Sequence, residues 1–149
     1  MKPLIRRGRL PWLVVGIALA ACMGPRVGPG GVAEPLGGTA WRLADLDGRP
    51  AVVGTGDAVP TLSLAAGEAR ASGNGGCNQF NGAYTQSGAS LRFGPLASTR
   101  RACADPAANA QETAYLRALE STTRFAVYDD LLVLYAGDQP VARLRRSGG

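Results

Sequence analysis

One stretch of the chain says most about its structure: Gly73-Asn74-Gly75-Gly76-Cys77-Asn78-Gln79-Phe80-Asn81-Gly82-Ala83-Tyr84. Its first four residues include three glycines, a composition too permissive for regular structure, so we expect a bulge or a close crossing of two backbones there. Short segments that alternate apolar and polar residues surround this stretch, and turn residues separate them. The pattern predicts a mainly β domain.

Strands are expected on both sides of this stretch. Thr39 to Leu46 runs into Asp47-Gly48, a dipeptide that favours a tight hairpin, so Ala51 to Val53 is the expected partner. Asp129-Asp130 and Gly137-Asp138 separate the last three segments, as in an antiparallel meander. The expected strands are residues 39–46, 51–53, 61–65, 68–72, 83–85, 90–93, 124–128, 131–135 and 139–145.

One helix interrupts the strands. Asp105 suits the N-cap, and Pro106 suits the first helical position because its missing N–H costs nothing there. Tyr115, Leu116 and Leu119 then recur at the spacing that lines one face of a helix. We expect a helix over about residues 106–121, lying across the sheet.

Residues 131–135 are apolar at every position, so both faces of this strand need cover. We expect the helix on one side and the interior of a barrel on the other, and the alternative is an exposed strand that docks a partner. In the last strand, Ala142 and Leu144 fall on one face, whereas Arg143 and Arg145 fall on the other and point to water.

The first 21 residues resemble a signal peptide. Four basic residues precede Leu10 to Ala20, an apolar run shorter than the roughly 20 residues that a membrane-spanning helix needs. The run ends in Leu19-Ala20-Ala21-Cys22, which resembles the lipobox where bacterial signal peptidases cut before a cysteine that is then lipidated. We expect cleavage before Cys22 and anchoring to a membrane through lipid on Cys22.

Residues 22–36 are rich in Gly and Pro and offer no periodic apolar face, so they are expected to form a flexible tether. Met23 is not the Asp that in many Gram-negative lipoproteins signals retention in the inner membrane. We therefore expect the outer membrane, facing the periplasm. Processing removes four of the sixteen basic residues and none of the eleven acidic ones, so the nearly neutral mature chain gives no reason to expect nucleic-acid binding.

A second dense motif reads Phe93-Gly94-Pro95-Leu96-Ala97-Ser98-Thr99-Arg100-Arg101-Ala102-Cys103. With the stretch that begins at Gly73, it resembles the META or HslJ-like domain of bacterial envelope lipoproteins. The resemblance covers residues 37–146, which leaves residues 147–149 as a tail. Arg101 departs from the family, in which Met is common at this position. The motif residues carried over are Gly76, Asn78, Phe80, Gly82, Gly94, Pro95, Leu96, Ser98, Thr99 and Arg100.

The resemblance implies a small antiparallel, barrel-like sheet, lipocalin-like in outline, with one packed α-helix. We expect about seven to eight strands in such a sheet, close to the nine strand segments and the one helix described above. The family is associated with envelope stress and antibiotic tolerance rather than with a reaction. The resemblance therefore addresses architecture more than mechanism.

Cys77 and Cys103 are expected to form a disulfide, because paired cysteines outside the cytosol normally do so. The alternatives are two buried free thiols or a reactive redox pair. Asn78, Asn81 and Tyr84 have two interpretations as well. Either they form a polar binding cluster, or the Asn side chains satisfy backbone groups while aromatic side chains fill the core; we favour the second.

Three arginines lie in or directly before the second motif. Arg92, Arg100 and Arg101 either meet lipid phosphate or an acidic partner, or they pair with Asp105 or Glu112 on a solvated face. The second interpretation is the preferred one.

Common catalytic arrangements are missing from the mature chain. The chain has no His, and its only Lys is Lys2, so Ser98 has no His or Lys to act as its base and no Schiff base can form. Without His, zinc or iron would need clustered cysteines and carboxylates. Asp45-Leu46-Asp47-Gly48 begins like a calcium loop but lacks the Glu that the loop requires. We expect no catalytic site, metal or cofactor.

The sequence thus predicts a non-enzymatic outer-membrane lipoprotein that supports envelope integrity or tolerance of stress by binding a protein or a small apolar ligand. One alternative is a lipocalin-like carrier with an internal cavity. The other is an inhibitor or assembly factor that presents a loop or a strand edge to an envelope enzyme or secretion component.

Overall fold

The computed structural model describes residues 34–101 and 103–148. The expected signal peptide, Cys22 and residues 22–33 of the expected tether lie outside them. The strands are β1 (Thr39–Leu46), β2 (Arg49–Pro50), β3 (Thr61–Leu64), β4 (Arg70–Asn74), β5 (Gln79–Ser87), β6 (Ser90–Phe93), β7 (Ala97–Ser98), β8 (Arg124–Tyr128), β9 (Leu131–Ala136) and β10 (Gln139–Arg146). The helix α1 spans Pro106–Ser121, and a short 3-10 turn, η1, spans Thr55–Asp57.

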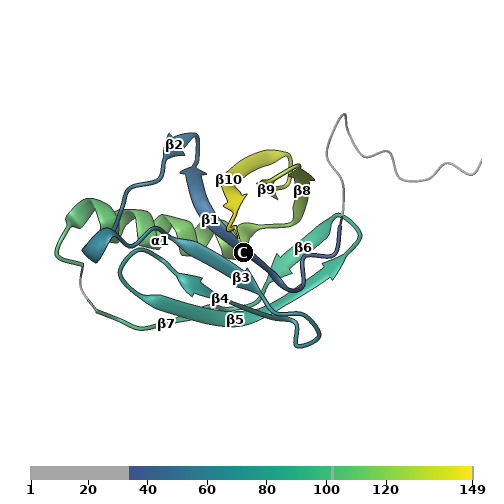
Figure 1. Ribbon diagram of the computed structural model, residues 1–149, viewed down its shortest axis with the longest axis horizontal. Coiled ribbons are helices and arrows are strands. Elements are labelled where there is room, and N and C mark those ends of the chain that lie inside the picture. Colours follow the sequence, from purple (N-terminus) through teal and green to yellow (C-terminus); the bar gives the residue numbers. More distant parts are fainter. Residues whose placement is uncertain (1–33, 102, 149) are drawn as a thin grey trace, which may run out of the picture.

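The strands form one curved antiparallel sheet that closes into a ring (Figure 1). Around the ring the order is β1, β3, β4, β5, β6, β8, β9 and β10, and β10 pairs with β1. The two shortest strands, β2 and β7, are attached to β1 and β5. The weakest junction joins β6 to β8 through the pair Ser90 and Arg124. The expected barrel-like sheet with one helix is confirmed.

Side chains fill the interior of the ring. They alternate along the strands, so that one face of each strand points inward and the other outward. Trp41 is fully buried, for example, whereas its neighbour Arg42 is exposed. The core includes Leu36, Trp41, Leu43, Leu62, Leu64, Phe80, Tyr84, Leu91, Phe93, Tyr115, Leu119, Phe125, Val127, Leu132, Leu134 and Leu144.

Helix α1 begins and ends where the sequence predicts. The Asp105 carboxylate accepts a hydrogen bond from the Ala107 amide (2.8 Å), and Pro106 takes the first turn. The helix packs against β1, β6, β9 and β10. Its Tyr115 is fully buried, meets the Phe80 ring edge-to-face at 6.0 Å between centroids, and donates to the Thr61 carbonyl. The helix therefore contributes to the same core as the inner face of the ring.

The prediction of what lies on the two faces of residues 131–135 is partly wrong. Leu132 and Leu134 do face the core, but α1 packs on that same inner side. On the outer face Val133 is buried although it lies outside the core cluster, and Leu131 and Tyr135 beside it are half-buried. The helix therefore does not lie on the outer face of this strand, as the sequence analysis expected, but on the inner one.

Two further strand limits differ from those expected. The partner of β1 is Arg49–Pro50, and residues 51–53 are not a strand, because the Gln111 side chain takes both the N–H and the carbonyl of Val52. Gly73 was expected in irregular structure but lies in β4. The expected close crossing is present all the same, since a Cβ at Gly73 would collide with the Thr61 carbonyl.

The domain begins before residue 37, where the sequence analysis placed its start. Leu36 is fully buried, and its amide donates to the Gln86 side chain (3.0 Å). Glu34 pairs with Arg146 at 2.6 Å. Residues 34–36 thus pack with the domain rather than with a tether. Within the described part of the chain, no helix has the length and apolar character needed to cross a membrane.

Candidate functional site

The two motifs of the sequence lie side by side. Cys77 and Cys103 form a disulfide with Cα atoms 5.6 Å apart, as expected. Phe80 pairs with Ser98 and Asn81 with Ala97 across β5 and β7. The two segments therefore run antiparallel to each other over most of their length, from the disulfide at one end to Gly82 at the other.

Asn78 fastens the two motifs together. Its amide group donates to the Arg101 carbonyl (2.9 Å), and its side-chain oxygen accepts from the Arg101 amide (2.8 Å) and the Thr99 hydroxyl (3.1 Å). Asn78 is 3% exposed, whereas Asn81 is exposed. Asn78 therefore satisfies backbone groups, and the interpretation of Asn78, Asn81 and Tyr84 as a polar binding cluster is not supported.

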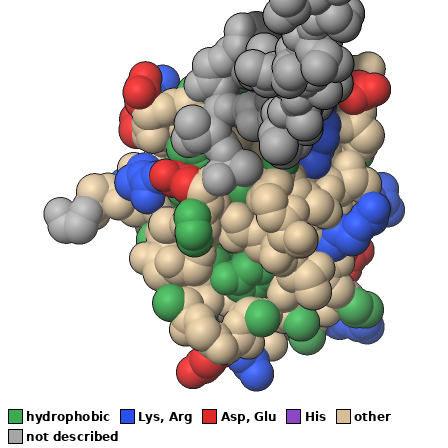
Figure 2. All heavy atoms as spheres, turned by 90° about the vertical axis from the view of Figure 1, so that its right-hand side faces the viewer, with side chains coloured by type: hydrophobic (Ala, Val, Ile, Leu, Met, Phe, Trp, Pro, Cys, Tyr) green, Lys and Arg blue, Asp and Glu red, His purple; other side chains and the backbone are tan. Residues whose placement is uncertain are grey.

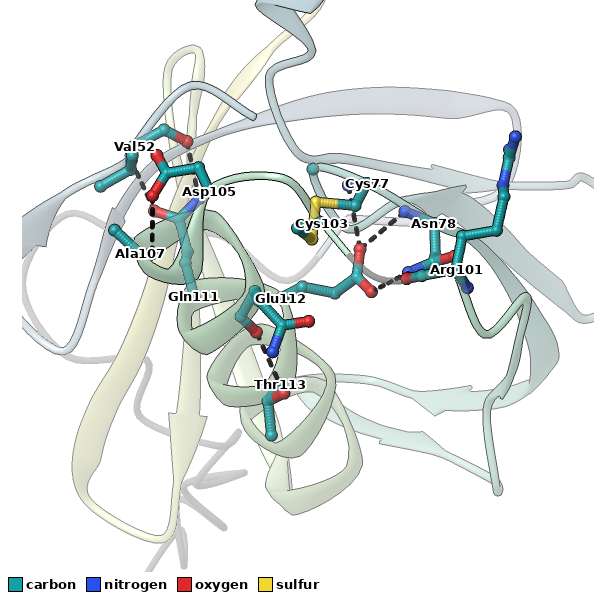
Figure 3. The surroundings of a disulfide bond; sticks show 12 residues. Val52, Cys77, Asn78, Arg101, Cys103, Asp105, Ala107, Gln111, Glu112 and Thr113 are labelled. Carbon is teal, nitrogen blue, oxygen red and sulfur yellow. Dashed lines mark hydrogen bonds between the residues drawn. A yellow bond between two sulfur atoms is a disulfide. The ribbon is translucent and has the colours of Figure 1, made fainter. Parts of the chain in front are cut away.

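Glu112 braces this junction from the helix, as Figure 3 shows. Its Oε2 accepts from the amides of Cys77 (3.0 Å) and Asn78 (2.7 Å), and its Oε1 accepts from the Asn78 side chain (2.6 Å). Glu112 is 7% exposed, and its carboxylate accepts hydrogen bonds from neutral N–H groups. A buried polar group needs such partners, because leaving it unpaired is costly.

The glycines of the motifs allow this close packing. A Cβ on Gly75 would lie 2.6 Å from the Glu112 Cγ, and a Cβ on Gly82 would lie 2.7 Å from the Leu96 Cδ2 and 2.9 Å from the Pro95 carbonyl oxygen. Only a residue without a side chain fits at either place. The glycines of the first motif and the Gly-Pro-Leu of the second are thus two halves of one packing arrangement.

Most of the remaining motif residues also have structural contacts, and Arg100 is the exception. Phe80 is in the core, and the Gly94 amide donates to the Ala83 carbonyl (2.9 Å). Thr99 exchanges hydrogen bonds with Gln79, and the Ser98 hydroxyl donates to the Thr99 carbonyl (3.1 Å). Gly76 has a φ of 120°, which side chains rarely adopt, and Arg100 is exposed. The motifs therefore hold the fold together.

The expected pairing of Arg92, Arg100 and Arg101 with Asp105 or Glu112 is wrong. The Asp105 carboxylate caps α1, and the Glu112 carboxylate faces inward to the amides of the first motif. The sequence analysis therefore missed the role of Glu112. The signal was available, because Glu112 lies three residues before Tyr115 and seven before Leu119, on the same face of the helix.

One group of side chains has the composition of a metal site. Within the described residues, the sulfurs of Cys77 and Cys103 and a Glu112 oxygen lie within 4.8 Å of one another. A thiolate is the form of cysteine that binds metals, and the disulfide consumes both thiols. The donor set of the oxidised protein therefore does not fit a metal ion.

A groove lies between α1 and the β1–β2 hairpin. Its volume is about 500 Å³, and both apolar and polar residues line it. Val52 and Val53, which are 40% and 49% exposed, are the only large hydrophobic residues exposed among those described, and Val52 lines the groove. The lining residues are Leu46, Asp47, Arg49, Pro50, Val52, Ala107, Ala110, Gln111 and Ala114.

Solved structures resemble this fold. An NMR structure of a protein from Burkholderia xenovorans is 30% identical, covers 85% of this chain and 96% of that chain, and superposes with a TM-score of 0.65. A second NMR structure is 24% identical, covers 74% of this chain and 90% of its own, and has a TM-score of 0.60, which shows likeness of fold. No curated protein matches the chain at a significant level.

The family comparison agrees with the two motifs and with the ring. The META domain family matches residues 34–148, a range that includes Glu34 and Leu36, which pack with the domain. These limits replace the expected 37–146. The chain belongs to the META domain family.

Proposed function

We propose that the chain is a non-enzymatic bacterial lipoprotein of the outer membrane, whose META domain supports envelope integrity by binding another envelope protein. The observation that carries the proposal is that the conspicuous polar residues of the motifs make structural contacts. The side chain of Asn78 in the first motif and that of Glu112 on the helix are both engaged in the contacts that join the two motifs to the helix. A site built for chemistry would leave such groups facing a substrate.

The proposed anchor is supported by the sequence alone. Leu19-Ala20-Ala21-Cys22 follows a basic start and a short apolar run, and more than one acyl chain makes attachment to a membrane effectively stable. The disulfide is compatible with this location, because disulfides persist in oxidising compartments.

A genetic complementation experiment tests the function. A strain that lacks the protein receives the wild-type chain, Cys22→Ser, or Ser98→Ala, and its permeability to a large antibiotic is measured. We expect the wild-type chain and Ser98→Ala to restore the barrier and Cys22→Ser to fail, because an unanchored domain does not stay at the membrane. Loss of function in Ser98→Ala at normal protein levels would instead favour chemistry at that hydroxyl.

The groove favours a second candidate, an inhibitor or assembly factor. Exposed Val52 and Val53 lie on a loop that Gln111 fixes in place, so the loop is presented in one conformation. Substituting both with Ser tests this candidate, because it should abolish complementation without unfolding the domain. The carrier is less well supported, since side chains of the core occupy the inside of the ring.

A further inference from the structure

Two arginines lie directly opposite each other on the outside of the ring. Arg42 of β1 pairs in register with Arg145 of β10, and both side chains are exposed. Like charges in this position repel each other and weaken the pairing of the strands. A negative group that lies between the two guanidinium groups would offset this repulsion.

The charges around this pair are not fully neutralised. Arg145 forms an ion pair with Asp130 (3.1 Å), in which both side chains are more than half exposed. Arg42 forms no ion pair or side-chain hydrogen bond with any residue that the structure describes. Among the residues described, Arg42 is therefore an unpaired, exposed cation beside the ion pair of Arg145 and Asp130, and these three groups together carry a charge of +1. Around the side of the molecule drawn in Figure 2, basic and acidic side chains mostly lie next to one another.

The pair lies next to the place where the chain enters the domain. Arg146, beside Arg145, holds Glu34 at 2.6 Å, and the Ser147 amide donates to the carbonyl of Ala40, two residues before Arg42. Glu34 lies twelve positions after Cys22, and a chain of that length spans at most about 40 Å. A domain anchored through Cys22 thus keeps this face within reach of the membrane.

The neighbouring side chains also suit a lipid surface. In the same row across the sheet, Leu131 lies opposite Arg145 and Tyr128 lies opposite Leu131. Both are half-buried on the outer face. Arg and Tyr side chains place an apolar body and a polar tip at the level of lipid headgroups.

We propose that the outer face around Arg42 and Arg145 binds the phosphate groups of an anionic phospholipid surface, so that the META domain lies against the membrane. A phosphate between the two guanidinium groups replaces their repulsion by charge-assisted hydrogen bonds. This inference builds on the proposed lipid anchor, but the binding that it predicts can be measured in a protein without the anchor. It predicts binding by the folded domain itself.

The test uses the mature chain with Cys22→Ser, so that no acyl chain contributes to binding. Flotation with vesicles of phosphatidylglycerol or of phosphatidylcholine is measured at low salt and at about 0.5 M salt. We expect binding to the anionic vesicles alone, lost at high salt because exposed charges are then screened. No binding to anionic vesicles would overturn the inference, while acylation of Cys22 in the wild-type protein would still support the proposed function.

Arg42→Glu and Arg92→Glu form a matched pair of variants. Both arginines are exposed on outer faces and both changes alter the net charge equally, but Arg92 lies opposite Thr85, on β6. We expect about a ten-fold loss of vesicle binding for Arg42→Glu and less than a two-fold loss for Arg92→Glu. Equal losses would show that overall charge alone acts, which contradicts the proposed face.

The stability of Arg42→Glu separates lost binding from lost folding. The new Glu lies opposite Arg145 and attracts it, so the melting temperature should rise slightly while vesicle binding falls. Inorganic phosphate at a millimolar concentration provides a last comparison. If it displaces the protein from vesicles although sodium chloride of the same ionic strength does not, the face prefers a soluble anion and the lipid assignment is wrong.

Discussion

At the scale of single residues, Glu112 explains most about this domain. It is buried on α1 and accepts hydrogen bonds from two backbone amides and from the Asn78 side chain. Through Asn78 it reaches Arg101, so one carboxylate connects the helix to both motifs. A change here should affect the whole domain rather than one strand.

Replacing Glu112 with Gln should therefore destabilise the fold. The new NH₂ group would face N–H donors in place of an acceptor, which leaves a buried donor unpaired and costs about 1–3 kcal/mol in the free energy of unfolding. Urea denaturation followed by circular dichroism measures the change. Glu68→Gln is the control, because Glu68 is exposed and makes no hydrogen bond among the described residues. Equal stability of the two variants would contradict this role of Glu112.

Tyr115 gives the domain a predictable sensitivity to alkali. Complete burial raises the pKa of its hydroxyl well above the usual value of 10.0. Above pH 10 the unfolded chain loses this proton and the folded chain keeps it, so folding stability is full below that pH and falls as the pH rises. The loss approaches about 1.4 kcal/mol for each pH unit.

Tyr115→Phe should weaken this pH dependence. Urea midpoints at pH 8 and pH 11 should lie closer together in the variant than in the wild-type protein, although Tyr135, whose pKa is also raised chiefly by burial, retains part of the effect. A wild-type dependence that persists undiminished in Tyr115→Phe would assign the alkaline loss to other groups.

At the scale of elements, the antiparallel contact of the two motifs is the organising feature. The disulfide closes a loop of sequence separation 26, and the bonds of Asn78 and Thr99 continue the contact toward β7. The disulfide and the polar network therefore act on the same segments. Removing either of them should lower the stability of the domain without unfolding it.

The variant Cys77→Ser/Cys103→Ser should remain folded but lose about 2–4 kcal/mol, because cross-linking restricts the unfolded chain. The free energy of unfolding in urea measures the loss, and the circular dichroism spectrum should keep its native shape. Addition of a reductant to the Cys22→Ser protein should produce a loss of similar size. No loss in either case would make the disulfide irrelevant to stability.

Elements with local signals were predictable. Asp105, Pro106 and the apolar spacing fix the limits of α1, and the turn residues after residue 128 separate β8, β9 and β10. Contacts distant in sequence were not predictable from the pattern. Gln111, 59 positions after Val52, binds the backbone of Val52 and so keeps residues 51–53 out of the sheet. Strand β7 forms because β5 offers it backbone partners.

The same distinction applies to the site. The disulfide and the structural use of Asn78 were expected from residue types, and the structure confirms both. The roles of Gly75 and Gly82 depend on what lies opposite them, which is Glu112 in one case and Leu96 in the other. The sequence shows a glycine at each position but not its neighbour in space.

At the scale of the whole molecule, β10 pairs with β1 and closes the ring, so the strand edges that remain lie at the short β2 and β7 and at the single pair that joins β6 to β8. Its interior is filled by side chains. The surfaces open to other molecules are therefore the groove beside α1 and the outer face of the sheet. Both surfaces are available for the contact with an envelope protein that the proposed function requires.

The central claim is that a disulfide-closed META domain is held at a membrane by lipid on Cys22. Intact mass spectrometry of the protein extracted from cell envelopes tests the claim most directly. The account predicts a chain that starts at Cys22, carries the added mass of acyl groups, and is two hydrogens lighter than the dithiol form. A chain that retains Met1, carries no acyl group and has free thiols at Cys77 and Cys103 would contradict it.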